Sequence, residues 1–218
     1  MNSKQEVCEE EILQHLFDNY TITMEHQQSI GVYLEVLGKR DPATRLHSIR
    51  VAYLASRMGV AACRSDINPK VLVWAGLLHD IGKSLIDPSL FRQGAPFDEA
   101  AYKEMEQHVL FGVRLLRGVH DWTAYIIARH HRFGSRPYPE DLPPLPLYLK
   151  EKEEFINLYA RLLALADFYD ALMTRKDGKF GSKKLSTKEK RDIYLKENND
   201  MKDFILQLER QGTLTFSD

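Results

Sequence analysis

The stretch that decides the fold is VLVWAGLLHDIGK, residues 71–83. Its apolar run leads directly into an adjacent histidine and aspartate, His79 and Asp80, followed by Gly82 and Lys83. A helix through this run would bury its apolar stripe in a core. The last turn of such a helix can carry an imidazole and a carboxylate without burying an unpaired charge. The stretch therefore indicates a core helix that holds His79 and Asp80 in place for chemistry.

Helix start signals recur along the chain. Asp41-Pro42 and Asn68-Pro69 each combine an N-cap with a proline at the first helical position, and Ser186 with Glu189 reads as a capping box. The remaining signals are N-caps at Asp98 and Asp121 and C-terminal stops at Gly38 and Gly59. Helices are expected over residues 3–17, 24–37, 42–59 and 153–174. Further helices are expected to begin at residues 69, 88 and 187, and a last helix is expected to end near residue 211.

Strand signals are nearly absent, because no segment sustains an alternation of apolar and polar residues between turn signals. We therefore predict an all-α fold, a helical bundle. The segment RPYPEDLPPLP, residues 136–146, holds five of the nine prolines and is expected to be an extended loop. RKDGKFGSKK, residues 175–184, is expected to be a second loop.

Composition and charge exclude several classes of protein. The 218 residues are 44% hydrophobic and 28% charged, which is typical of a soluble globular domain. We assign residues 1–38 to N-terminal helices that pack on the core, and 39–218 to the main domain. A net charge of -1 argues against nucleic acid and membrane partners. Cys8 and Cys63 do not suggest a disulfide framework, and without a signal peptide or an apolar span we expect a cytoplasmic protein.

Five of the eight histidines lie in sequence contexts that suggest a function: His47, His79, His108, His130 and His131. Asp167 lies in LALADFYDAL, a mainly apolar stretch in which a carboxylate is expected to be buried. Each residue alone has an ordinary alternative. His47 could be a core or surface histidine, His130-His131 a helix C-cap, and Asp167 a structural partner of Arg161 or Lys152. The set as a whole favours a metal site.

The residue types define which metals would suit. Imidazoles and carboxylates without cysteine are typical ligands of iron, manganese, nickel or zinc in sites with open positions. A pair of divalent ions needs a bridging carboxylate and several neutral imidazoles. On a helix, His79 and Asp80 project about 100° apart, so one can bind an ion while the other bridges it to a neighbour.

In this order and spacing, the residues resemble the HD superfamily of metal-dependent phosphohydrolases, and most closely its HD-GYP branch. The resemblance covers about residues 40–175. It implies an HD-type helical bundle and two divalent metal ions, with iron or manganese favoured and nickel or zinc as alternatives. It implies that His47, His79, Asp80 and Asp167 hold one ion, and that Asp80 bridges to a second ion bound by His108, His130 and His131.

The resemblance also implies a reaction. A hydroxide held between the ions would attack the phosphorus of a nucleotide or cyclic dinucleotide, with Asp80 and Lys83 as catalytic residues. The residues expected to contact the substrate are Lys83, Arg50, Arg132 and Arg136. A homodimer or a signalling protein is the further partner considered.

Two departures from the HD-GYP pattern keep an alternative open. Arg132 stands where that branch has a glutamate, and Pro137-Tyr138-Pro139 stands where it has Gly-Tyr-Pro. After DALM, the usual Arg-Pro-Tyr element is replaced by TRKDGKFG. The alternative function is a regulatory or binding module with weak or no catalytic activity.

Overall fold

The computed structural model describes residues 3–91, 98–174 and 185–216, with the backbone alone for residues 3–8. The helices are α1 (Ser3–Asn19), α2 (Met24–Arg40), α3 (Pro42–Ala61), α4 (Pro69–Leu78), α5 (Glu99–Glu106), α6 (His108–Leu116), α7 (Asp121–Ile127), α8 (Leu147–Lys150), α9 (Glu153–Thr174), α10 (Thr187–Glu197) and α11 (Lys202–Arg210), with short 3₁₀ helices η1 (Ile81–Leu85), η2 (Pro88–Phe91) and η3 (Asn199–Met201). The described ranges hold no strand, which confirms the predicted all-α fold.

Several predicted helix starts are confirmed by the capping contacts. The side chains of Asp41 and Asn68 accept hydrogen bonds from backbone N–H groups at the starts of α3 and α4, each ahead of a proline. Asp98 caps α5, and Ser186 with Glu189 forms a capping box on α10. These caps satisfy N–H groups that have no partner within their own helix.

The predictions that Gly38 and Gly59 end their helices are wrong. Helix α2 continues to Arg40 and ends where Asp41, which precedes a proline, adopts an extended conformation. Helix α3 continues to Ala61, and Gly59 instead serves packing, because a Cβ there would lie 2.6 Å from Leu72 Cδ1.

The prediction that Asp121 is an N-cap is also wrong. His120 occupies that position, and Asp121 is the first residue of α7. The Asp121 carboxylate instead accepts a hydrogen bond from the Gly118 N–H at 2.5 Å, which closes the preceding turn.

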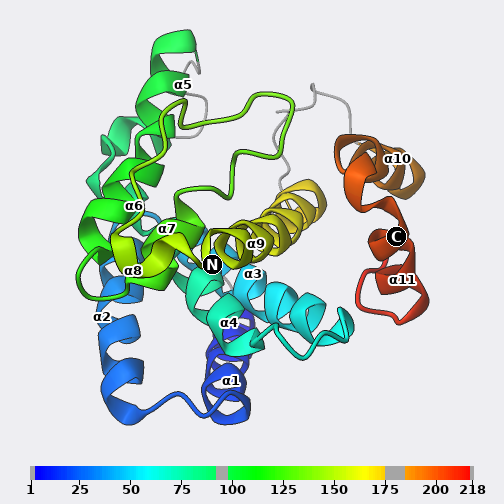
Figure 1. The fold of residues 1–218 in the computed structure, drawn as a ribbon, viewed down its shortest axis with the longest axis horizontal. Coiled ribbons are helices and arrows are strands. Elements are labelled where there is room, and N and C mark those ends of the chain that lie inside the picture. The colour runs from blue at the N-terminus through cyan, green and yellow to red at the C-terminus, as the bar shows by residue number, and fades with distance from the viewer. Residues whose placement is uncertain (1–2, 92–97, 175–184, 217–218) are drawn as a thin grey trace.

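Helices α3, α4 and α9 form the centre of the core. Figure 1 shows α9 near the middle of the molecule, with α5 to α8 on one side and α10 and α11 on the other. Helix α3 packs on α1, α2, α4 and α9. The contact between α3 and α4 is close because Gly76 faces Ala52 without a side chain. This close approach fixes the end of α4, where the chain delivers His79 and Asp80.

The C-terminal helices are tied to the core by polar contacts. The Arg161 guanidinium donates two hydrogen bonds to Asp200, at 2.9 and 2.8 Å. The buried Tyr194 hydroxyl donates to the Leu165 carbonyl at 3.0 Å. Arg161 is therefore a structural link between α9 and η3.

Three predictions about organisation have different outcomes. The extended loop over residues 136–146 is confirmed, since no helix forms between α7 and α8. The domain boundary at residue 38 stays a prediction, and it falls within α2. The predicted loop over 175–184 lies outside the described residues. Among the helices of the described chain, none is both long and apolar enough to span a membrane.

We predict opposite effects for two glycine-to-alanine changes in helix interiors. Gly76→Ala should lower the free energy of unfolding by about 1–3 kcal/mol, because the added Cβ would overlap Ala52. Gly31→Ala in α2 is the matched control. Its Cβ would meet nothing within 4 Å, so the better helix propensity of alanine should raise the free energy by up to about 1 kcal/mol. Urea unfolding measures both, and equal shifts would contradict the packing account.

Candidate metal centre

Five elements deliver the seven predicted metal ligands to one place. His47 comes from α3, Asp167 from α9, and His108 is the first residue of α6. His79 and Asp80 follow the end of α4, and His130 and His131 follow α7. Three overlapping groups have all ligand atoms within 4.8 Å of one another: His47, His79 and Asp167; His79, Asp80 and His130; and His108, His130 and His131.

Three of the imidazoles are oriented by the same backbone contact. The Nδ1 atoms of His79, His108 and His130 lie 2.9, 2.6 and 2.6 Å from the carbonyl oxygen three residues earlier in the chain. A carbonyl only accepts, so Nδ1 carries the proton and Nε2 presents its lone pair. Backbone carbonyls commonly fix metal-ligating histidines in this way.

The three Nε2 atoms are the strongest indication of a metal site. All three are buried and have no hydrogen-bond partner among the described residues. A buried acceptor without a partner costs about 1–3 kcal/mol, so three together need an explanation. Burial lowers the pKa of His108 to about 3 and that of His130 to about 4. Both rings are therefore neutral near pH 7, which is the form that binds a metal ion.

Asp80 lies between the groups of ligands. Its side chain is almost fully buried, with Oδ1 3.3 Å from His108 Nε2 and Oδ2 3.4 Å from His79 Nε2. Oδ2 also accepts a hydrogen bond from Lys83 Nζ at 2.6 Å. Burial would raise the pKa of Asp80, but the charge of Lys83 and the nearby imidazoles hold it well below its usual range. The two oxygens of an ionised Asp80 thus face different histidines.

His47 is held between two carboxylates of α9. Its Nε2 lies 3.0 Å from Asp167 Oδ1, and its Nδ1 lies 2.7 Å from Asp170 Oδ2. Burial would lower the pKa of His47, but the hydrogen bonds to Asp167 and Asp170 raise it to about 9. The pKa of Asp167 is held well below its usual range, because the contacts with His47 and the charge of nearby imidazoles outweigh burial.

Asp170 is a positioning residue that the prediction of site residues missed. Arg50 donates to both of its oxygens, from Nε at 2.7 Å and from Nη2 at 3.0 Å. The signal was present in the sequence, because Asp170 lies one helical turn beyond Asp167 and shares its face. Arg50, predicted to contact the substrate, has its guanidinium directed to Asp170.

The loop after the double histidine covers part of the cluster. The Tyr138 ring stacks on the ring of His131, with centroids 4.4 Å apart. Arg132 donates from Nη1 to the carbonyl oxygens of Pro139 at 2.5 Å and Glu140 at 3.0 Å, which closes the loop on itself. The substrate contact predicted for Arg132 remains a prediction, and the described contacts of this side chain support the loop.

Arg136 lies on an exposed part of the same loop. It pairs with Glu99 at 2.5 Å and lies over the ring of Tyr102, 5.0 Å from its centroid. Its substrate contact also stays a prediction. Of the predicted substrate contacts, Lys83 alone has a described hydrogen bond to one of the seven ligand residues.

The donor set fits two divalent ions. The inward-facing Nε2 lone pairs of His79, His108 and His130 and the ionised carboxylates of Asp80 and Asp167 are the ligands such ions prefer, and no cysteine is among them. The group of His79, Asp80 and His130 shares one histidine with each of the other two groups, which provides for two adjacent positions on either side of Asp80.

Comparison with known proteins identifies a family. A family model described as the HD domain matches residues 44–172, more than half of the chain. A cyclic di-GMP phosphodiesterase of Thermotoga maritima is 27% identical over 161 residues, which are 70% of this chain and 41% of that protein. A 3'3'-cGAMP-specific phosphodiesterase of Vibrio cholerae is 24% identical over 66% of this chain and 30% of its own length. The chain thus spans less than half of these relatives.

A solved structure supports the fold. The HD domain of the Listeria monocytogenes phosphodiesterase PgpH, in complex with cyclic di-AMP, has a TM-score of 0.51 with 19% sequence identity. The match covers 85% of this chain and 86% of that one. At this level of identity the similarity concerns the helical arrangement.

We predict that Asp170→Asn weakens metal binding without unfolding the protein. The substitution removes the charge that orients His47, and loss of such a supporting group typically costs 10–100-fold in metal affinity. Asp200→Asn is the matched control, because Asp200 also pairs with an arginine through both oxygens but lies in η3. Titration with Mn²⁺ measures both affinities. Wild-type affinity in Asp170→Asn would contradict the positioning role.

Proposed function

Because the chain belongs to the HD domain family, we propose that it is a metal-dependent phosphohydrolase that cleaves a phosphoester bond of a cyclic dinucleotide. The observation that carries the proposal is the set of three buried, unpartnered Nε2 atoms around the Asp80 carboxylate. Such a site is built for cations, and an arrangement with two adjacent positions is typical of phosphoester hydrolysis.

The proposal assigns the ligands to two positions. His47, His79, Asp80 and Asp167 hold one ion, for which the group of His47, His79 and Asp167 gives support. Asp80, His108, His130 and His131 hold the other, for which the group of His108, His130 and His131 gives support. When bound, two such ions supply a nucleophile from water at neutral pH and stabilise negative charge on phosphate oxygens. Iron or manganese is proposed.

Lys83 is proposed to bind the substrate phosphate. Its side chain is mostly buried, and its ammonium group is hydrogen-bonded to Asp80 at the end of the ligand group. A lysine is a compact point charge with three donors. When bound cations neutralise part of the charge of Asp80, the Lys83 ammonium can direct one of its N–H donors to an oxygen of the substrate phosphate. Lys83 thereby orients the phosphorus beside the ligand group.

The substrate class is proposed from the relatives. Their names describe phosphodiesterases that act on cyclic di-GMP or 3'3'-cGAMP. The Tyr138 ring, in the loop after His131, stacks on the ring of His131, a proposed metal ligand. We infer that Tyr138 limits which cyclic dinucleotides fit beside the metal ligands. The second candidate function is a binding module without turnover, in which the stacked Tyr138 ring keeps the phosphate of the ligand away from the metal ligands. A homodimer or signalling partner and a cytoplasmic location stay predictions.

We predict that the protein, loaded anaerobically with Mn²⁺ or Fe²⁺, releases linear product from at least one cyclic dinucleotide. Asp80→Asn should abolish hydrolysis and lower metal content, because the bridging carboxylate is lost. Lys83→Met should keep the metal and lose about 100-fold in hydrolysis, a loss typical of removing one charge-stabilising group. Chromatography of the products measures each rate.

Lys39→Met is the matched control, because Lys39 is an exposed lysine that pairs with Glu35 on α2. It should hydrolyse at the wild-type rate. If the metal-loaded wild type binds cyclic dinucleotides without product release, the binding module is correct. Full hydrolysis by Asp80→Asn would contradict the enzyme proposal altogether.

A further inference from the structure

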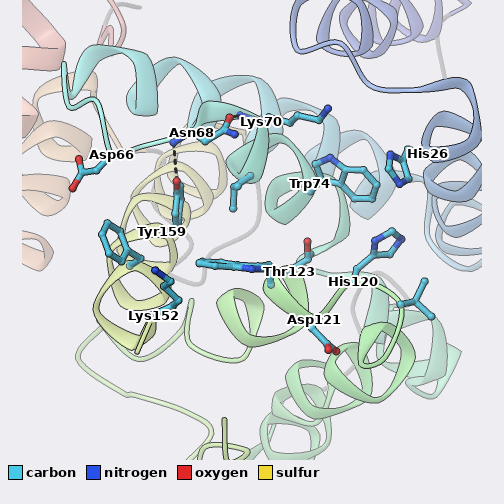
Figure 2. Close-up of a pocket in the computed structure, with 14 residues that line it drawn as sticks. His26, Asp66, Asn68, Lys70, Trp74, His120, Asp121, Thr123, Lys152 and Tyr159 are labelled. Carbon is cyan, nitrogen blue, oxygen red and sulfur yellow. Dashed lines mark hydrogen bonds between the residues drawn. The ribbon is translucent and has the colours of Figure 1, made fainter. Parts of the chain in front are cut away.

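A second cleft lies away from the metal ligands. It has a volume of about 630 Å³ and is lined from α2, α4, α7 and α9 and from the connections that precede α4, α7 and α9. Figure 2 shows His26, Trp74 and His120 gathered on one side of it, with Tyr159 and Lys152 on the other. None of the seven ligand residues lines it. Small-molecule sites commonly have volumes in the range of 300–1,000 Å³.

The cleft and the metal ligands share helices but occupy different parts of them. On α4 the cleft uses Trp74, whereas His79 follows the C-terminal end. On α9 it uses Tyr159, which lies about 12 Å along the axis from Asp167 at the rise of an α-helix. The cleft is therefore a separate site rather than an extension of the metal centre.

Aromatic rings form the walls. The ring of Trp74 lies 4.6 Å from that of His120 and 4.8 Å from that of His26, and Trp122 meets Tyr159 edge to face. Trp122 is 37% exposed at this cleft, although tryptophan is usually well buried. An exposed ring face beside further aromatic rings is suited to stacking with a planar ligand.

One polar atom in the wall lacks a partner. His26 Nδ1 is buried and has no hydrogen-bond partner in the described part of the chain. By contrast, the Tyr159 hydroxyl accepts a hydrogen bond from the Asn68 N–H at 2.7 Å. A ring nitrogen can donate or accept, according to its protonation, so His26 offers a hydrogen bond to a polar group on the ligand.

The carboxylates at the cleft are already engaged. Arg64 donates to both oxygens of Asp66, at 2.9 and 2.6 Å. Asp121 accepts hydrogen bonds from the Gly118 N–H and the Tyr148 hydroxyl. These contacts offset much of the attraction that either carboxylate would have for a cationic ligand.

The ammonium groups are less engaged. Lys70 Nζ donates to the carbonyl oxygen of Thr21 at 3.0 Å, and among the described residues no carboxylate pairs with its charge. Lys152 is exposed and forms no ion pair within the described ranges. The charge available to a ligand is thus positive.

We propose that this cleft is a second ligand site, which binds a small planar aromatic ring that carries an anionic group. The ring packs against Trp122 and Trp74, and the carboxylate or phosphate of the ligand pairs with Lys152. The two kinds of anion share this chemistry, and the experiment separates them.

The chain offers its own probe, because it has two tryptophans and both line the cleft. Adenosine monophosphate and benzoate are titrated against metal-loaded protein, with adenosine and benzamide as uncharged counterparts, and tryptophan fluorescence is followed. We expect a saturable change with at least one anion and about tenfold weaker binding of its uncharged counterpart. Response to the monophosphate alone assigns a phosphate ligand, and response to benzoate alone assigns a carboxylate.

Lys152→Gln should raise the Kd of the anion about tenfold, whereas Lys150→Gln, at an exposed lysine of α8 outside the cleft, should leave it unchanged. No saturable change with either anion, or an unchanged Kd in Lys152→Gln, would overturn the proposal. Cyclic dinucleotide hydrolysis is measured on the same variant and should equal that of wild type. If Lys152→Gln lost both hydrolysis and anion binding, the substrate itself would bind in the cleft, and this result would contradict a separate site.

Discussion

The arrangement of the seven proposed metal ligands depends on one buried carboxylate. Asp80 is 1% exposed, and its two oxygens face histidines of different elements. Taking a carboxylate out of water costs several kcal/mol unless cations or donors compensate. Lys83 supplies one hydrogen bond, but the adjacent imidazoles present lone pairs rather than protons. Lone pairs and a carboxylate gathered in a dry interior are stable together when positive charge lies between them, which is the physical basis of the proposed two-ion centre.

The fold places this carboxylate by close backbone contacts. At Gly82 an added Cβ would overlap the carbonyl oxygen of His108, so only glycine lets η1 pack directly on the start of α6. Gly76 does the same between α4 and α3. The chain therefore enters and leaves the His79-Asp80 pair through two glycine contacts. Rigid placement of this kind is what a metal site needs, because its ligands must hold their geometry to within about 0.5 Å.

Much of this could be predicted from the sequence, because the signals are local. Proline and N-cap pairs marked the starts of α3 and α4, and the ordered histidines and aspartates indicated side chains that the structure gathers in one place. The errors arose where a role depends on partners distant in sequence. Gly59 permits close packing against Leu72 rather than ending a helix. The substrate contact of Arg50 stays a prediction, but its hydrogen bonds to Asp170, 120 residues further along the chain, had no local signal. The aromatic cleft was missed because its walls come from four helices.

The central claim is that Asp80 bridges two metal ions. Anomalous diffraction from crystals of the Mn²⁺-loaded protein tests it most directly. Two peaks are expected, one among His47, His79 and Asp167 and the other among His108, His130 and His131, each within bonding distance of one Asp80 oxygen. A single peak that Asp80 does not contact, or no peak among these residues at saturating Mn²⁺, would contradict the account.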